Sequence, residues 1–437
     1  MHERRRFHRR LLLVSGVAFV LRISVLVLDR SLTVSGDAWY YQITAADIVA
    51  GVGRPNSIHP PGWGLLLIPL ELLGLGSTFP QQIFAALLGT TAVILVGFCG
   101  RSIAGDRAGL LAAGIAALHP GLWVHERTLL PEVPVLPLAA LLILLSYAYW
   151  NEPRLRDAVA IGLVIGCLGL IRSEQLLLLL VLAGPLLLSV HAERLTLRER
   201  IGFMSAATLA AIFVIAPWLV YVNTTSREPV MMSTNFGYTL GAANCPGTYD
   251  GPLIGSVNPE CWNVLTVLPG DASEQAAGMR ERGLSFARDN RSRLPLVILA
   301  RQGRTWGFFR PVQQAEIDAD FAHGRDQTYL AATVVYWLLL PIAIVGALEL
   351  RRRNYPVYIL AAPVVVGVIA TALTLGQARA RAPAELALVL LAAVALDHWL
   401  GKSRNTTTPG ATAREQAAPD CPHDGDGAEP SYRDVRQ

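Results

Sequence analysis

Apolar residues in this chain occur in long blocks that short arginine-bearing segments separate. A helix needs about 20 mostly apolar residues to cross a bilayer, and ten blocks approach that length. The pattern therefore predicts an all-α, polytopic membrane protein with about ten transmembrane helices. The ten predicted spans are residues 11–28, 81–100, 108–123, 133–150, 158–171, 176–190, 201–222, 329–348, 355–375 and 386–400.

Two of these spans, 158–171 and 176–190, are short, and Arg172, Ser173 and Glu174 lie between them. They could form one long buried hairpin or two tight spans. Short cytoplasmic segments collect arginine, and a merged hairpin would turn the following arginine-rich loops outward. The charge pattern therefore favours ten spans with both chain ends on the cytoplasmic side.

Composition supports the membrane class. The chain is 52% hydrophobic and only 16% charged, whereas soluble proteins average about 25% charged residues. An ordinary soluble domain, a disordered chain and a collagen-like chain are thereby excluded. The net charge of +4 follows from the cytoplasmic arginines and gives no evidence for nucleic-acid binding. Lys402 is the only lysine among 37 basic residues, a usage typical of a high-GC bacterium.

Two predicted outer segments are long, residues 29–80 and 223–328. The first contains two apolar stretches, 38–50 and 62–75, which we expect to be helices at the membrane surface. The second turns amphipathic over residues 272–309, and loops of this size are uncommon unless they are functional. The chain thus divides into a membrane domain, residues 1–400, and a polar tail, residues 401–437, which we expect to be a disordered cytoplasmic segment.

Two of the five cysteines, Cys245 and Cys261, lie in the second outer segment. An oxidising compartment would permit a disulfide there. The sequence leaves a bridge and two unpaired thiols equally open, and the cysteine spacing fits no zinc motif.

Ionisable residues near the predicted outer face are candidates for chemistry, because buried charge in a membrane is costly and usually serves a task. Asp37 follows the first span, where its carboxylate could cap a surface helix or act as a base. His59 lies in a proline-rich turn, where a plain surface histidine is the simpler interpretation. Glu126 precedes the fourth span, and Glu132 opens it, where helix capping is again an alternative.

Three outer arginines, Arg172, Arg379 and Arg381, run against the bias that places positive charge inside. Topology does not explain them, whereas an anionic ligand would. The planar guanidinium suits phosphate, and a lipid phosphate would present itself at this depth. Simple contact with lipid headgroups is the alternative.

Short motifs follow one another in a definite order. They are GDAWYY from Gly36, HPPGW from His59, LLPE ending at Glu132, RSE from Arg172, a Pro-Trp followed by Asn223 and Ser-Thr-Asn-x-Gly between Pro217 and Gly237, and QARARAP from Gln377. Over about residues 10–400 this order resembles the GT-C membrane glycosyltransferases. The resemblance is greatest to the bacterial branch that includes the aminoarabinose transferase and the protein O-mannosyltransferase relatives.

The resemblance implies a GT-C fold and inverting transfer of a sugar from a polyprenyl-phosphate donor to an acceptor hydroxyl at the outer face of the plasma membrane. It implies that Asp37 is the catalytic base, and Arg379 and Arg381 match the late Arg-x-Arg-x-Pro motif of the family. The growing charge of a leaving phosphate needs fixed cations, so we expect Arg379 and Arg381, together with Arg172, to bind the donor phosphate. The residues expected to position the acceptor or other substrate groups are Tyr41, His59, Glu126, Glu132 and Asn235. Ala38, Trp63 and Ala380 depart from the family pattern and bear on substrate identity.

The expected partners are the lipid-linked sugar donor, the bilayer, and an envelope glycan, lipid or protein that accepts the sugar. No cofactor is required by this reasoning. A divalent cation held by Asp37 with Glu126 or Glu132 stays open, although the sequence has no metal-ligand spacing.

The main alternative is a transporter or a flippase for lipid-linked sugars, and a third is a structural partner of an envelope enzyme. A transporter needs ionisable residues near the bilayer midplane. Arg22 is the only charged residue well inside a predicted span, and it lies toward the outer end. The remaining charges collect at one interface, which favours transfer between a lipid donor and an outside acceptor.

Overall fold

A computed structural model of the 437-residue chain describes residues 2–28, 34, 36–52, 57–262, 268–322 and 324–406. These ranges contain helices and no strand, which confirms the all-α class. The α-helices are α1 (His2–Leu28), α2 (Gly36–Ala50), α3 (Gly62–Leu72), α4 (Thr78–Ala104), α5 (Asp106–Leu118), α6 (Pro120–Thr128), α7 (Glu132–Asn151), α8 (Leu155–Ile171), α9 (Gly184–Leu188), α10 (Leu197–Thr225), α11 (Asn235–Ala243), α12 (Pro246–Tyr249), α13 (Pro259–Trp262), α14 (Ala272–Asp289), α15 (Leu294–Thr305), α16 (Pro311–Ala322), α17 (Asp326–Arg352), α18 (Tyr358–Leu373) and α19 (Ala382–Thr406).

Each of the ten predicted spans is helical, but the segments differ in length. Within the described ranges, six helices are long and apolar enough to cross a membrane, and a seventh crossing results if α5 and α6 form one bent span. The predicted spans at 158–171, 176–190 and 355–375 correspond to shorter segments. The chain is therefore a multi-pass membrane protein, and the number ten stays a prediction.

The predicted span 108–123 is broken rather than straight. Helices α5 and α6 meet at a bend of 46°. Pro120 opens α6, and His119 caps it by accepting a hydrogen bond on Nδ1 from the backbone N–H of Gly121, at 3.0 Å. Proline cannot donate a backbone hydrogen bond to the preceding turn, so the chain changes direction there.

The segment after α8 is also irregular. Arg172 has an extended backbone, and a 3-10 turn (η1, Ser173–Leu177), a π-helical turn (η2, Leu179–Ala183) and α9 follow it. Helix α8 therefore ends at Ile171, and the apolar segment that follows Arg172 is separate and bent.

Helices α8 and α10 pack through small residues. Gly162 and Gly166, one turn apart on α8, face Ala207 and Ala211 of α10. A Cβ atom at Gly166 would lie 2.9 Å from the carbonyl oxygen of Ala211, and one at Gly162 would collide with the backbone of Ala207. Small residues let helix backbones approach closely, which is a main source of helix association in apolar surroundings.

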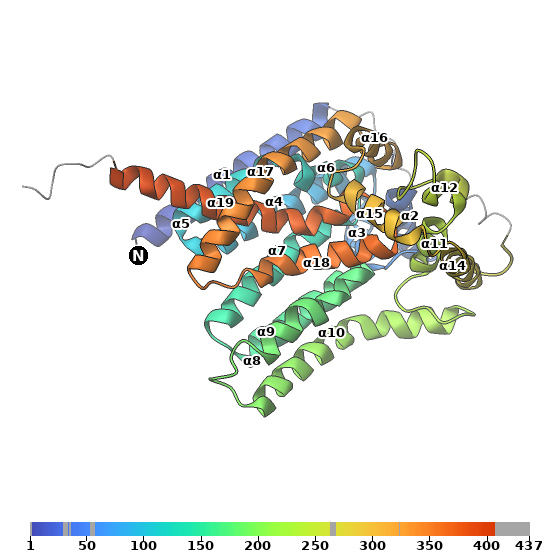
Figure 1. Ribbon diagram of the computed structural model, residues 1–437, viewed down its shortest axis with the longest axis horizontal. Coiled ribbons are helices and arrows are strands. Elements are labelled where there is room, and N and C mark those ends of the chain that lie inside the picture. The colour runs from blue at the N-terminus through green and yellow to red at the C-terminus, as the bar shows by residue number, and fades with distance from the viewer. Residues whose placement is uncertain are drawn as a thin grey trace, which may run out of the picture. The chain divides into compact units, whose positions relative to one another are not determined.

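The short helices of the two predicted outer segments lie at one end of the long helices. Figure 1 shows α2 and α3 there, together with α11, α12, α14, α15 and α16. Helices α2 and α3 correspond to the expected surface helices at 38–50 and 62–75. The amphipathic stretch 272–309 forms α14 and α15. The candidate residues of both outer segments are thereby brought to the same end of the helical bundle.

The described residues up to Asp397 form one compact unit, and a second unit begins at His398. In the second unit, α19 continues to Thr406, so the first six residues of the predicted tail are helical. Residues 407–437, the rest of that tail, lie outside the described residues, as do parts of the outer segments at 29–33, 35, 53–56 and 263–267.

We expect Gly162→Ala to lower the unfolding free energy by about 1–3 kcal/mol, because the added methyl group meets the backbone of Ala207. Gly202→Ala on α10 is the matched control, since a Cβ atom there has no neighbour within 4 Å and alanine is the better helix former. Thermal unfolding of both purified variants checks this, and equal melting temperatures would contradict the close helix contact.

Candidate functional site

The end of the bundle at which the short helices lie contains an ion pair between residues from opposite ends of the chain. Asp37, at the start of α2, accepts a hydrogen bond on Oδ2 from Nη1 of Arg379, at 2.8 Å. Arg379 lies in a 3-10 turn, η4 (Ala378–Arg381), between α18 and α19. The side chains remain 17% and 15% exposed, so both can reach a ligand from outside.

Neighbouring side chains hold the Arg379 guanidinium in place. Its Nε donates to the side-chain oxygen of Gln377 at 2.9 Å. Its central carbon lies 4.7 Å from the centre of the Phe321 ring, within the range of a cation–π interaction. Arg379 is therefore oriented by three contacts, one of which is the carboxylate of Asp37.

Electrostatics keep Asp37 ionised. Burial alone would raise the pKa of its carboxyl group, but the charge of Arg379 and the hydrogen bond from Arg379 outweigh burial and lower it. The Nε2 atom of His59 lies 3.6 Å from Oδ1 of Asp37. Burial lowers the pKa of His59 despite the nearby carboxylate, so this histidine is neutral at physiological pH.

Two tyrosines of α2 surround His59. The ring centres of Tyr40 and Tyr41 lie 5.1 and 5.3 Å from that of His59. Burial and then the charge of Asp37 raise the pKa of Tyr41 well above its usual value. Tyr41 therefore keeps its hydroxyl proton, and the structure places this predicted site residue beside Asp37 and His59.

A second cationic group adjoins the first. Arg172, at the break after α8, pairs with Glu132 through Nη1 and with Glu174 through Nε. Burial would lower the pKa of Arg172, but the charges of Glu174 and Glu132 raise it. Glu132 is only 1% exposed, whereas the Arg172 side chain is 20% exposed. The buried carboxylate of Glu132 thus pairs with the guanidinium of Arg172, which remains accessible to ligands.

The proline-rich turn supports this second pair. The indole N–H of Trp63 donates to the carbonyl oxygen of Leu129, at 2.7 Å, in the turn that leads to Glu132. A Cβ atom at Gly62 would meet the carbonyl oxygen of Leu170 at 2.7 Å. Only glycine allows the turn to pack against the end of α8, where Arg172 follows.

The structure gives Arg381 a different place from the one predicted. Its side chain is 2% exposed and donates to Glu385 at 2.6 Å, to the carbonyl oxygen of Thr305 and to Thr333. It also lies over the ring of Tyr336. Arg379 and Arg381 point in different directions because the 3-10 turn separates them by about 240°. Arg381 is consequently engaged inside the protein and does not face Asp37.

Glu126 is likewise removed from the site. Its carboxylate accepts a hydrogen bond from Nε of Arg22 at 2.8 Å, and both side chains are 3–4% exposed. Successive residues on a helix point about 100° apart, so His125, and not Glu126, faces the ring of Tyr329. The predicted acceptor contact by Glu126 is therefore replaced by a buried ion pair with Arg22.

Asn235 anchors the loop that carries His59. Its backbone N–H donates to the carbonyl oxygen of Ile58 at 2.9 Å, and that of Thr234 donates to Ser57 at 2.7 Å. The Asn235 side chain accepts a hydrogen bond from Thr239. The Ser-Thr-Asn motif thus has a structural role beside the site.

The preceding Pro-Trp motif is also structural. Trp218 donates its indole N–H to the carbonyl oxygen of Met232 at 2.7 Å, and Asn223 forms two hydrogen bonds with the backbone of Val230. These contacts close the connection between α10 and α11.

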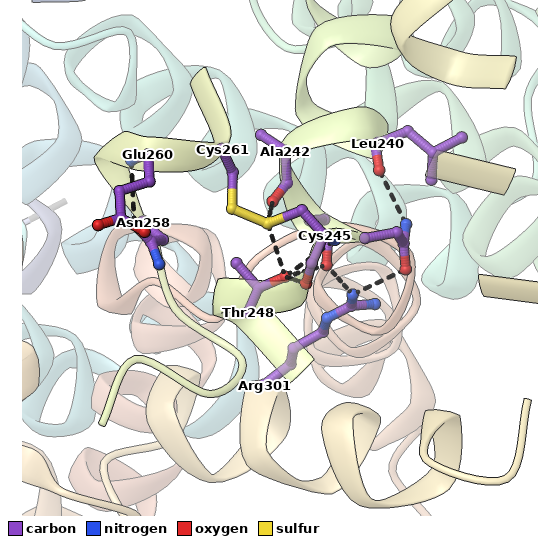
Figure 2. Close-up of a disulfide and its surroundings, with 10 residues drawn as sticks. Leu240, Ala242, Cys245, Thr248, Asn258, Glu260, Cys261 and Arg301 are labelled. Atoms are coloured by element: carbon purple, nitrogen blue, oxygen red, sulfur yellow. Dashed lines mark hydrogen bonds between the residues drawn. A yellow bond between two sulfur atoms is a disulfide. The ribbon is translucent and has the colours of Figure 1, made fainter. Parts of the chain in front are cut away.

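A disulfide joins Cys245 and Cys261, the alternative that the sequence left open. Figure 2 shows Arg301 beside this disulfide. Arg301 donates to Asn244 and to the carbonyl oxygen of Ala243, and also to Ala372 near the end of α18. One buried arginine therefore connects the disulfide-bonded segment to the helix that precedes Arg379.

A divalent cation does not fit the present arrangement. Among the described residues, no group of three histidine, cysteine or acidic side chains could hold a metal ion. The carboxylates of Asp37, Glu132 and Glu126 pair with three different arginines. The acidic residues proposed for a cation site are therefore dispersed among separate ion pairs.

Sequence reasoning missed two residues that shape the site, Asp318 and Phe321 of α16. Both lie in the long outer segment without a recognisable motif. The sequence of α16 shows an alternation of apolar and acidic residues. This pattern does not indicate that the helix packs against Arg379.

Comparisons with known proteins concern part of the sequence and the fold. A family model described as dolichyl-phosphate-mannose-protein mannosyltransferase matches residues 59–221, a range that contains His59, Glu132 and Arg172 but neither Asp37 nor Arg379. No curated protein matches the chain by sequence.

Solved structures provide a similar fold. The oligosaccharyltransferase of Archaeoglobus fulgidus, in complex with Zn and sulfate, has a TM-score of 0.55 at 12% identity, over 90% of this chain and 50% of that one. AglB from the same organism, with an inhibitory peptide and a dolichol-phosphate, has a TM-score of 0.50 at 12% identity, over 93% and 52%. ArnT from Cupriavidus metallidurans has a TM-score of 0.38 at 15% identity, over 88% and 76%.

Residues 59–221 are therefore similar to this mannosyltransferase family, and the fold of the chain is similar to that of the oligosaccharyltransferase structures. This confirms the resemblance seen in the order of sequence motifs. The chain spans about half the length of the oligosaccharyltransferase structures that it matches. At this identity the likeness concerns the fold.

We expect Arg22→Ala to lower the unfolding free energy by about 3–5 kcal/mol, because Glu126 would be left buried without its partner. Adding Glu126→Gln should recover part of this loss by removing the unpaired charge. Arg353→Ala is the control, since its pair with Glu349 is solvent-exposed on the arginine side and contributes less than about 1 kcal/mol. Thermal unfolding measures all three, and an Arg22→Ala protein as stable as wild type would contradict the structural role.

Proposed function

We propose that the chain transfers a sugar from a polyprenyl-phosphate donor to an acceptor hydroxyl at the outer face of the bacterial plasma membrane. The observation that carries this proposal is the partly exposed pair of Asp37 and Arg379. It combines a carboxylate that can accept a proton with a guanidinium that can bind phosphate. Glycosyl transfer from a lipid phosphate needs both groups at one interface.

In the proposed reaction Asp37 is the general base. It removes the proton of the acceptor hydroxyl while the hydroxyl oxygen forms a bond to the anomeric carbon. The bond between that carbon and the phosphate oxygen breaks, and the phosphate leaves with the electron pair. A single displacement of this kind inverts the configuration at the anomeric carbon.

The leaving phosphate gains negative charge, which Arg379 and Arg172 would stabilise. Without donor, Arg379 pairs with Asp37. A donor phosphate that draws the guanidinium toward itself would raise the pKa of Asp37 and make it a stronger base. Binding of the donor would thereby prepare the base for the acceptor.

The other site residues would have supporting roles. Tyr41 and His59 lie beside Asp37 and would orient the acceptor, while Glu132 would orient Arg172. Asn235 would act through the loop that precedes His59. Arg381, bonded to Glu385, would support the fold of η4 and leave phosphate binding to Arg379 and Arg172.

The positive-inside bias supports cytoplasmic termini and a site at the outer face. The acceptor would then be an envelope glycan, lipid or protein. The dolichol-phosphate bound by AglB supports a lipid-phosphate donor of the same chemical class for this chain.

Reconstitution tests the proposal directly. Purified protein in liposomes would receive radiolabelled undecaprenyl-phosphate sugars, with mannose, arabinose and galactose tested separately, and membranes from a strain that lacks the protein as acceptor. Incorporation of label supports transfer. Protein-dependent crossing of the lipid without incorporation would support a flippase, and the absence of both would support a scaffold.

We expect Asp37→Asn to reduce transfer at least about 100-fold, the usual contribution of a general base, because the amide cannot accept the proton. Thermal unfolding and insertion should remain near wild type. Asp47→Asn, on the same helix, is the matched control and should retain activity. Near-normal turnover by the purified Asp37→Asn protein would show that Asp37 is not the base.

The pH dependence provides a separate prediction. Because the charge of Arg379 lowers the pKa of Asp37, Arg379→Gln should raise that pKa and move the acidic limb of the rate profile to higher pH. Donor use should also weaken. Values of kcat/KM for the donor, measured between pH 4 and 8, report the free enzyme and check the shift. An unchanged limb would show that the pair does not control the base.

A further inference from the structure

Helix α16 supports the Arg379 turn at two points. Oδ2 of Asp318 accepts a hydrogen bond from the backbone N–H of Ala378, the residue before Arg379, at 3.1 Å. Oδ1 of Asp318 accepts one from the side-chain amide of Gln314 at 3.0 Å. Three residues further along α16, Phe321 contacts the Arg379 guanidinium. One helix therefore holds both the backbone and the side chain of this segment.

A buried polar network fixes Asp318 from behind. The side-chain oxygen of Gln314 accepts hydrogen bonds from Arg304 at 3.1 Å and from Ser256 at 3.2 Å. Arg304 is fully buried and also donates to the carbonyl oxygens of Ile254 and Pro252, at 2.6 and 2.8 Å. A buried network whose members are bonded in this way is rigid, so the position of Asp318 is well defined.

Keeping Asp318 ionised is unfavourable for folding. Burial raises its pKa from 3.8 to about 6, although the hydrogen bonds from Ala378 and Gln314 and the charges of Arg379 and Arg381 favour the anion. Arg304 faces it from α15 and Tyr329 from α17. Because the folded state binds the proton more tightly, stability falls as the pH rises from about 4 to about 6.

We propose that Asp318 is a positioning residue, which holds the η4 turn so that the Arg379 guanidinium points toward the donor phosphate. The proposal rests on the donor-binding role proposed for Arg379. Arg381 holds the end of this turn, and the carboxylate of Asp318 holds its beginning by accepting the hydrogen bond from the N–H of Ala378. The contact with Asp318 therefore helps to set the orientation of Arg379, which lies between them. Pre-orienting a cation in this way avoids an ordering cost when the ligand binds.

Binding of undecaprenyl phosphate to the full chain in lipid nanodiscs tests this inference. Arg379→Ala should weaken binding by about tenfold or more, the effect of losing a charge-assisted hydrogen bond. Asp318→Ala should weaken it by about three- to tenfold. The double variant should bind no more weakly than Arg379→Ala, because Asp318 acts through Arg379. Asp320→Ala, at an exposed position of the same helix, should bind like wild type.

Several outcomes would overturn the inference. Wild-type affinity in Asp318→Ala, with binding weakened in Arg379→Ala, would remove the positioning role and leave the donor site standing. Additive effects in the double variant would show that Asp318 acts independently of Arg379. Absence of binding by the wild-type protein would overturn both the proposed function and this inference.

If Asp318→Ala does not fold, Asp318→Asn takes its place, because the amide keeps one acceptor oxygen. It should weaken binding by about threefold, and this effect should vanish when Arg379→Ala is also present. An Asp318→Asn protein with wild-type affinity would overturn the inference in the same way.

Discussion

Charge buried among apolar helices requires an opposite charge nearby, because an unpaired ion in such surroundings costs several kcal/mol. The protein meets this constraint with arginine–carboxylate pairs. Exposure divides the pairs into two kinds. The closed pairs, with all side chains no more than 4% exposed, are Arg22–Glu126 and Arg381–Glu385. The pairs with arginines that remain 15–20% exposed are Asp37–Arg379, Glu132–Arg172 and Glu174–Arg172.

The closed pairs can contribute to stability, whereas the pairs with accessible arginines, the open pairs, are candidates for chemistry. A closed pair satisfies its own charges and can tie helices together. An open pair leaves its arginine accessible to an anion, and the two open arginines lie close enough for their charges to act on the same residues, Asp37 and Tyr41. The proposed donor site therefore consists of the ion pairs whose arginines remain accessible to a ligand.

The outer segments supply the supports that the open pairs need. The 57–59 loop is tied to the start of α11, the Trp63 indole holds the turn before Glu132, and α16 holds the turn before Arg379. Most motif residues that suggested a family resemblance have such structural contacts. The order of the motifs along the chain follows the order of these structural contacts. For this reason the motif order indicates the fold better than it identifies the chemistry.

The sequence by itself determined the helices, the membrane class and a short set of candidate residues, because long apolar runs and misplaced arginines are visible without a fold. Asp37, Arg172 and Arg379 were in that set and do meet at one end of the bundle. Only the tertiary structure decided among close neighbours such as Glu126 and Glu132, or Arg379 and Arg381. The physical reason is that Glu126 and Glu132 lie on two different helices, α6 and α7, while Arg379 and Arg381 point in different directions from the η4 turn. The partner of each charge, and the exposure of the pair, depend on helices that are distant in the chain.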